Sequence, residues 1–155
     1  MASLKNYLWV FFISMVPIIE LRGAIPVGAT LGLPWVSNLI LCIVGNMLPV
    51  PFILLFIRHI LSWMKKTRLH RIAEWVEEKG KKNFGKVMKY ASVGLFLFVA
   101  IPLPGTGAWT GALVASMLDM RMKYALPSIF LGVVCAGVIM SLASYGFVSF
   151  LGFLM

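Results

Sequence analysis

The sequence predicts an all-α polytopic membrane protein built from two inverted repeats. Three observations lead to this class: 61% of the 155 residues are hydrophobic and 12% are charged, three long runs contain no charge, and most basic residues fall in one block. A soluble domain has roughly 45–50% apolar and about 25% charged residues. The composition therefore argues against a soluble enzyme or binding module.

The net charge of +9 is concentrated near the middle of the chain. Residues 58–89 carry ten basic and three acidic side chains, which gives this stretch a net charge of +7. Lys and Arg accumulate in cytoplasmic loops, so the block predicts a cytoplasmic linker that attracts anionic lipid headgroups. Its apolar residues recur at near-helical spacing, which predicts an amphipathic helix in the interface. No nucleic-acid partner is expected, because such a patch needs a soluble fold to present it.

The first half of the chain predicts a re-entrant hairpin at residues 7–33 and a transmembrane helix at 35–57. Leu8–Ile19 and Gly23–Leu33 are apolar arms of 12 and 11 residues, whereas a tilted crossing needs about 20. The segment 20–26, Glu-Leu-Arg-Gly-Ala-Ile-Pro, separates the two arms. Short arms around such a break are typical of discontinuous helices in transporters.

The second half repeats this order with a hairpin at 90–118 and a transmembrane helix at 122–146, followed by an apolar tail at 147–155. The break at 102–107 is rich in proline, which removes a backbone donor, and in glycine, which adopts unusual dihedral angles. Because each half crosses the membrane once, the second half is predicted to be inverted relative to the first. Small residues along the last helix favour close packing and make a homodimer a candidate assembly.

The charges that flank the second hairpin predict the topology. Lys89 precedes this hairpin and Arg121 follows it, so both of its ends are expected in the cytoplasm and both termini outside. A four-span arrangement with both termini inside is the alternative. Lys5 favours that alternative, but the four-span arrangement places Arg121 and Lys123 outside.

Glu20 and Arg22 are the charged residues at the first break. An isolated charge at bilayer depth costs about 2.5–3.5 kcal/mol on insertion scales, and such residues mark ion and substrate pathways. The alternative is that they pair with each other or with helix ends. Burial favours a neutral Glu20 and Arg22 favours an ionised one, so both charge states stay open.

The second break supplies backbone groups and hydroxyls rather than charge. Asp119 and Arg121 are expected to be interfacial anchors, and Asn46 is expected to hold helices together. The predicted substrate or ion site consists of Glu20, Arg22, Gly23, Pro26, Pro104, Gly105, Thr106, Gly107 and Thr110.

No arrangement typical of an enzyme or a metal site is recognisable. Cys42 and Cys135 lie in apolar runs without a CxxC spacing, and His59 and His70 have no further ligand nearby in the sequence. A serine, cysteine or paired-carboxylate constellation is also missing from any plausible common site. We therefore expect no metal, no cofactor and no enzymatic activity.

Two segments, Glu20–Pro26 and Ile101–Leu113, closely resemble the signature segments of the bacterial and archaeal small multi-drug export protein family. The resemblance covers nearly the whole chain, and this family looks like a compact branch of the DedA superfamily. It implies a prokaryotic cytoplasmic-membrane protein with two re-entrant hairpins. In DedA-like relatives an acidic residue in the first hairpin matters, and Glu20 is the matching position. They also use arginines in the second motif, where Pro104–Gly107 has none.

The residues and the resemblance together predict a proton-coupled membrane transporter. Its substrate or ion site is expected where the two hairpin tips meet near the bilayer midplane. The resemblance also implies an alternative, a translocase or scramblase of an anionic lipid such as a polyprenyl phosphate. A non-transporting structural membrane protein is the second alternative.

Overall fold

The computed structural model describes residues 3–65, 84–103 and 105–154. Every regular element in these ranges is a helix, which confirms the all-α class. The helices are α1 (Leu4–Met15), α2 (Glu20–Thr30), α3 (Trp35–Met47), α4 (Pro49–Lys65), α6 (Phe84–Ala100), α7 (Ala108–Met117) and α8 (Met122–Leu154).

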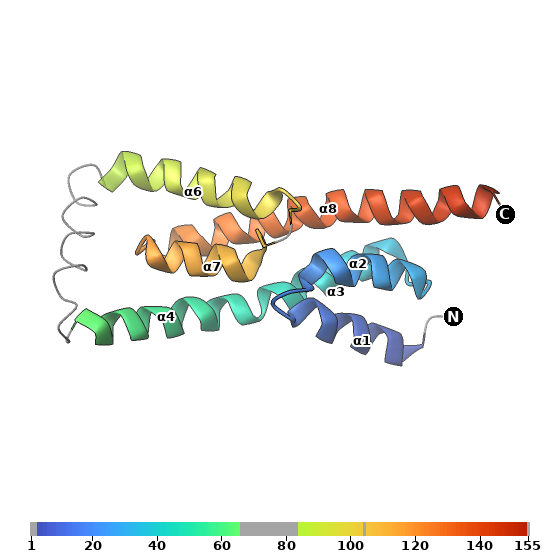
Figure 1. Ribbon diagram of the computed structural model, residues 1–155, viewed down its shortest axis with the longest axis horizontal. Helices are drawn as coiled ribbons and strands as arrows, with labels where there is room; N and C mark the ends of the chain where they lie inside the picture. The colour runs from blue at the N-terminus through green and yellow to red at the C-terminus, as the bar shows by residue number, and fades with distance from the viewer. Residues whose placement is uncertain (1–2, 66–83, 104, 155) are drawn as a thin grey trace.

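The two halves of the chain meet at the middle of an elongated bundle (Figure 1). Helices α1, α2 and α3 occupy one end, α6 and α7 occupy the other, and α8 runs along most of the length. Helix α1 begins and α8 finishes at the same end. The predicted linker helix at 58–89 falls mainly on residues 66–83, which lie outside the described ranges.

The first break lies earlier than the sequence indicated. Helix α1 ends at Met15, and α2 already begins at Glu20 and continues through Pro26. The interruption is therefore residues 16–19, where Pro17 cannot donate a backbone hydrogen bond. The segment 20–26, which we expected to separate the arms, is the first part of α2.

Two stretches are long and apolar enough to cross a bilayer. Trp35–Ile57 spans 23 residues across α3 and the start of α4, which join at Leu48. Met122–Phe150 spans 29 residues within α8. Helix α8 continues to Leu154, so the expected boundary between a span ending at 146 and a separate tail does not coincide with a helix end. Many apolar side chains on these helices are exposed, as a lipid-facing surface requires.

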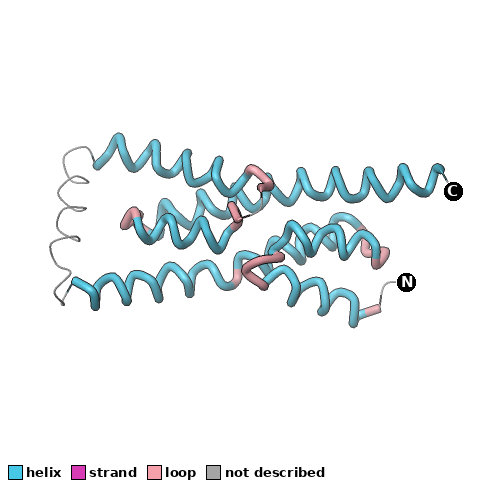
Figure 2. Tube along the Cα trace, in the orientation of Figure 1, coloured by secondary structure: helices cyan, strands magenta, loops and turns pink. Residues whose placement is uncertain are grey.

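The connections between helices lie at matching places in the two halves. The α1–α2 and α6–α7 connections lie near the middle of the molecule, while the α2–α3 and α7–α8 turns lie toward opposite ends (Figure 2). Both turns use a left-handed residue: φ is 72° at Gly32 and 50° at Asp119, which follows Gly32 by 87 positions. In each turn the next residue, Leu33 or Met120, donates its N–H to the carbonyl five residues back. This is the hydrogen bond of a Schellman cap.

The burial pattern repeats at the same 87-residue spacing. In α2 the residues Leu21, Ala24, Ile25, Gly28 and Ala29 are buried, and in α7 so are Ala108, Gly111, Ala112, Ala115 and Ser116. Gly45 of α3 lies against Ser14 of α1, and Gly132 of α8 lies against Val99 of α6. Each half therefore packs its first helix, at a glycine, on the helix that follows its left-handed turn.

Candidate functional site

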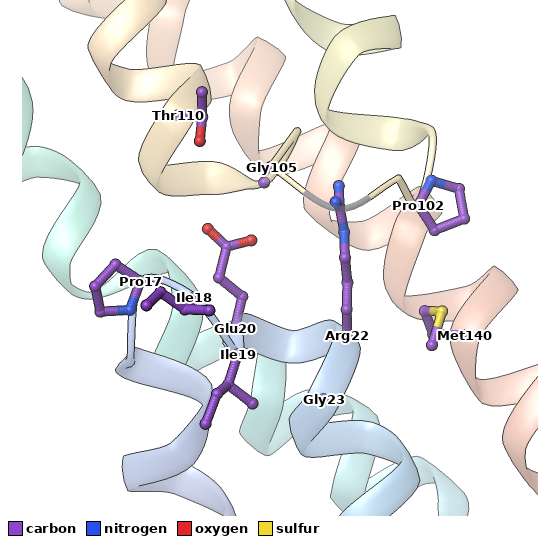
Figure 3. A pocket seen from close by; sticks show the side chains of 11 residues that line it. Pro17, Ile18, Ile19, Glu20, Arg22, Gly23, Pro102, Gly105, Thr110 and Met140 are labelled. Atoms are coloured by element: carbon purple, nitrogen blue, oxygen red, sulfur yellow. The ribbon is translucent and has the colours of Figure 1, made fainter.

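Glu20, at the start of α2, reaches across to the N-terminus of α7. Its side chain is 4% exposed, and the Trp109 backbone N–H donates to its Oε1 at 3.2 Å. Figure 3 shows the carboxylate directed away from α2 and toward α7. The first backbone N–H groups of a helix have no partner within it and carry partial positive charge. A carboxylate at this place satisfies a free donor and is favoured by the helix dipole.

Arg22 makes the complementary contact with the C-terminus of α6. Its Nη2 donates to the carbonyl oxygens of Val99 and Ile101, at 3.3 and 3.1 Å. The last carbonyls of a helix carry partial negative charge and favour a cation. Glu20 and Arg22 therefore cap the two helix ends at the break of the second half. This is the helix-end pairing that the sequence left open as an alternative to function.

Glu20 adopts an uncommon backbone conformation. Its φ is 50°, in the left-handed region, which non-glycine residues seldom occupy. Such a conformation persists only when the surrounding structure holds it. The contact with α7 and the hydrogen bond from the Glu20 N–H to the Val16 carbonyl, at 2.9 Å, provide that support.

Gly107 permits the close approach of Glu20 to α7. A Cβ at this position would overlap the Glu20 carboxylate group. The backbone of Gly107 is extended and would accept other residues. Space for the Glu20 carboxylate, rather than backbone freedom, is therefore what requires glycine here.

The turn that precedes α7 is closed by its own hydrogen bonds. The Thr106 hydroxyl can donate to the carbonyl of Ile101, at 2.8 Å, or of Leu103, at 3.0 Å. Gly105 has a φ of 84°, which glycine adopts without strain. Thr106 thus shapes this turn, while Pro104 lies outside the described residues.

A cavity of about 370 Å³ opens between the two breaks. This volume is within the range of small-molecule sites. Its charged groups are Glu20 and Arg22, and Thr110 adds a hydroxyl. The cavity is lined by Pro17, Ile18, Ile19, Glu20, Arg22, Gly23, Pro102, Gly105, Gly107, Thr110 and Met140.

The structure brings most of the sequence-predicted residues to this cavity. Pro26 does not line it, because it lies inside α2, one turn beyond Arg22. Thr106 is not among the lining residues either. Sequence reasoning missed Met140, which comes from α8 and carries no signal that distinguishes it from other apolar residues of that helix. It also missed Pro17 and Pro102, although both mark their breaks.

Two expectations concern groups elsewhere in the chain. The described residues contain no cluster of three or more His, Cys, Asp or Glu side chains that could hold a metal ion. Asn46 was expected to hold helices together, but its amide N and O are both buried and without a hydrogen-bond partner. Asn38 does this instead, since its Nδ2 donates to the Ile25 carbonyl at 2.9 Å.

The apolar spans, the exposed apolar side chains and the buried Glu20 define an all-helical membrane protein. Residues 20–139 match the family described as "Putative small multi-drug export protein". This match covers more than half of the chain, so the protein belongs to that family. A search of curated proteins and a search of solved structures each returned no match.

Proposed function

We propose that this protein is a proton-coupled secondary transporter. Its substrate or ion site is the cavity between the two breaks, near the bilayer midplane. Membership of an export-protein family supports transport as the general activity. The proton coupling and the site are inferred from the geometry of Glu20.

The observation that carries the proposal is the position of the Glu20 carboxylate. It is buried, it lines the cavity and it holds the N-terminus of the helix from the other half of the chain. Protonation removes the charge that the helix dipole favours and weakens the acceptor of the Trp109 N–H. Binding of a proton at Glu20 would therefore loosen the contact between the halves beside the cavity.

The matched features of the two halves support an inverted arrangement with re-entrant hairpins. The 12 and 11 residues of α1 and α2 extend about 18 and 16 Å, roughly half of a ~30 Å hydrocarbon core. The same turns and burial recur 87 positions later, with the turns toward opposite ends of the molecule. Transporters of this design bind substrate where discontinuous helices meet.

Proton movement into liposomes tests the proposal. With an imposed pH gradient, the reconstituted protein should change the pH of the liposome lumen. This proton flux should depend on the transported substrate or ion. Glu20→Gln should abolish this flux, because glutamine fits the space but cannot take up and release a proton as a carboxylate does. Asp119→Asn is the matched control, since Asp119 has the same φ of 50° but lies exposed in the α7–α8 turn. Equal flux in the wild type and Glu20→Gln would contradict the proposal.

A second candidate is translocation of an anionic lipid, as the resemblance to DedA-like proteins implies. Arg22 lines the cavity, and its Nε is buried without a partner, so this N–H can donate to a phosphate oxygen. The Nη2 contacts to α6 mean that the same side chain also has a structural role.

Arg22→Lys separates these two roles. Lysine keeps a cation at the α6 C-terminus but loses the planar fork that binds phosphate oxygens in pairs. If the protein moves lipid phosphates, the variant should fold normally and lose movement of a labelled lipid phosphate between leaflets, without any need for a pH gradient. Unchanged movement in Arg22→Lys would exclude a phosphate site that depends on the paired donors of Arg22.

A further inference from the structure

A buried stripe on α3 is polar where the matching stripe on α8 is apolar. Asn38, Cys42 and Asn46 recur every fourth residue, so they share one face of α3. All three are 0% exposed. The positions 87 residues later, Ala125, Ile129 and Val133, are also 0% exposed. Apolar side chains fill the matching buried positions on α8. Packing alone therefore does not explain the polar groups on α3.

The outer part of the stripe is hydrogen-bonded to the α2–α3 turn. Asn38 Nδ2 donates to the Tyr145 hydroxyl at 3.0 Å, and that hydroxyl donates to the Leu33 carbonyl at 2.7 Å. The Cys42 thiol lies 3.5 Å from Asn38 Oδ1. A continuous polar chain thus leads from Leu33, beside the exposed Gly32 and Pro34, into the bundle.

The inner part of the stripe has no hydrogen-bond partner in the described structure. This holds for both the Nδ2 and the Oδ1 of Asn46. The Oγ of Ser141, a residue of α8 that is 4% exposed, also has no partner there. An asparagine amide has two donor hydrogens and two acceptor sites. Buried polar groups in proteins are almost always paired with protein or with ordered water. Water is the ligand that matches these groups in size and chemistry.

The inner part of the stripe lies at the level of Glu20. Helices α2 and α3 run in opposite directions from their shared turn, and the bond from Asn38 to Ile25 sets their register. Asn38 also lies against Gly28 of α2. Glu20 is eight residues back from Gly28 along α2, and Asn46 is eight residues beyond Asn38 along α3, so each lies about 12 Å further into the bundle.

Ser141 belongs to the same seam between α2, α3 and α8. Gly137 of α8 lies against Leu21 of α2 and Leu39 of α3. Ser141 follows Gly137 by one helical turn, on the way to Tyr145. Ser141 therefore lies on the same side of α8 as Tyr145, whose hydroxyl accepts a hydrogen bond from Asn38.

We propose that ordered water occupies this seam and forms a one-sided path from the α2–α3 turn to Glu20. The seam is defined by Asn38, Cys42, Asn46, Ser141 and Tyr145. Its use for proton delivery rests on the proposed role of Glu20, but its hydration does not. The apolar stripe on the α8 side offers no equivalent path, so water reaches Glu20 from the end of the molecule where α1 begins.

Radical footprinting with X-ray pulses tests the hydration directly, because hydroxyl radicals formed from bound water oxidise the side chains next to it. The Ile129→Cys variant places two thiols at matched, fully buried positions of one molecule, Cys42 in the seam and a thiol in the apolar stripe. We expect rapid oxidation of Cys42, measured by mass spectrometry, and slow oxidation at position 129. Equal rates at the two positions would overturn the proposal.

Substitutions at Asn46 and Ser141 extend the test. Asn46→Val, which introduces the residue of the matching position, should lower Cys42 oxidation to the rate at position 129, and Ser141→Ala should lower it in part. Retention of the full rate in both variants would also overturn the proposal. In liposomes, Asn46→Val should slow proton flux without abolishing it. If Glu20→Gln leaves flux unchanged while Cys42 is still oxidised rapidly, the proposed function fails and the water path stands.

Discussion

At the scale of single residues, the contact between Glu20 and α7 depends on the absence of a side chain at position 107. Gly107→Ala places a methyl group in the volume of the Glu20 carboxylate. We expect the carboxylate to leave the α7 N-terminus and proton flux to fall to the level expected for Glu20→Gln. Overpacking also costs about 1–3 kcal/mol of stability, which thermal unfolding in detergent would detect.

Gly94→Ala is the matched control for this substitution. A Cβ at Gly94 meets nothing within 4 Å, and the position lies inside α6. Alanine is favoured over glycine in helices by up to about 1 kcal/mol, so this variant should be slightly more stable and fully active. Full activity in Gly107→Ala would show that the contact with α7 is not needed for flux.

The partners of Glu20 and Arg22 were not predictable from the sequence, although their position close to a break was. Both charges stand out because the residues next to them in the sequence are apolar, and a charge in an apolar run can be recognised from its sequence neighbours alone. Their contacts with Trp109, Val99 and Ile101 join positions far apart in the chain, which no local pattern reports. The unpaired amide of Asn46 was missed for the same reason.

At the scale of elements, the two Schellman turns differ in how well their residues suit the backbone. Gly32 adopts its φ of 72° freely, whereas Asp119 has a φ of 50° that disfavours a side chain. Asp119→Gly should therefore raise stability by up to about 1 kcal/mol, and Gly32→Ala should lower it by about 1–2 kcal/mol. Thermal unfolding of the two variants beside the wild type measures both effects. Shifts of the same sign in both variants would contradict this account of the turns.

Apolar spans were predictable where hydropathy alone sets them, and helix ends were not. The span at 35–57 follows directly from its uninterrupted apolar run. The end of α1 did not, because Pro17 and Pro26 are equal signals in the sequence. Pro17 stops a helix, whereas Pro26 is tolerated within α2, whose Leu21 and Ile25 are held in the core.

At the scale of the whole molecule, α1 begins at the end opposite to the facing ends of α4 and α6. If the basic block is cytoplasmic, both termini should then face the outside. In a chain with Cys42 and Cys135 replaced by alanine, Ser3→Cys and Leu154→Cys should react with an impermeant maleimide in intact cells. Lys81→Cys, in the basic block, should react only after permeabilisation. Labelling of all three positions only after permeabilisation would favour the four-span topology.

The pairing of Glu20 and Arg22 with oppositely polarised helix ends also has an electrical consequence. With Glu20 ionised, its charge and that of Arg22 cancel, so a rearrangement that carries both through the membrane moves no net charge. Once Glu20 is protonated, Arg22 leaves one uncompensated positive charge. A potential of 100 mV is worth about 2.3 kcal/mol for each elementary charge that crosses it. In the proposed cycle, membrane voltage therefore drives the proton-loaded protein and leaves the unloaded protein unaffected.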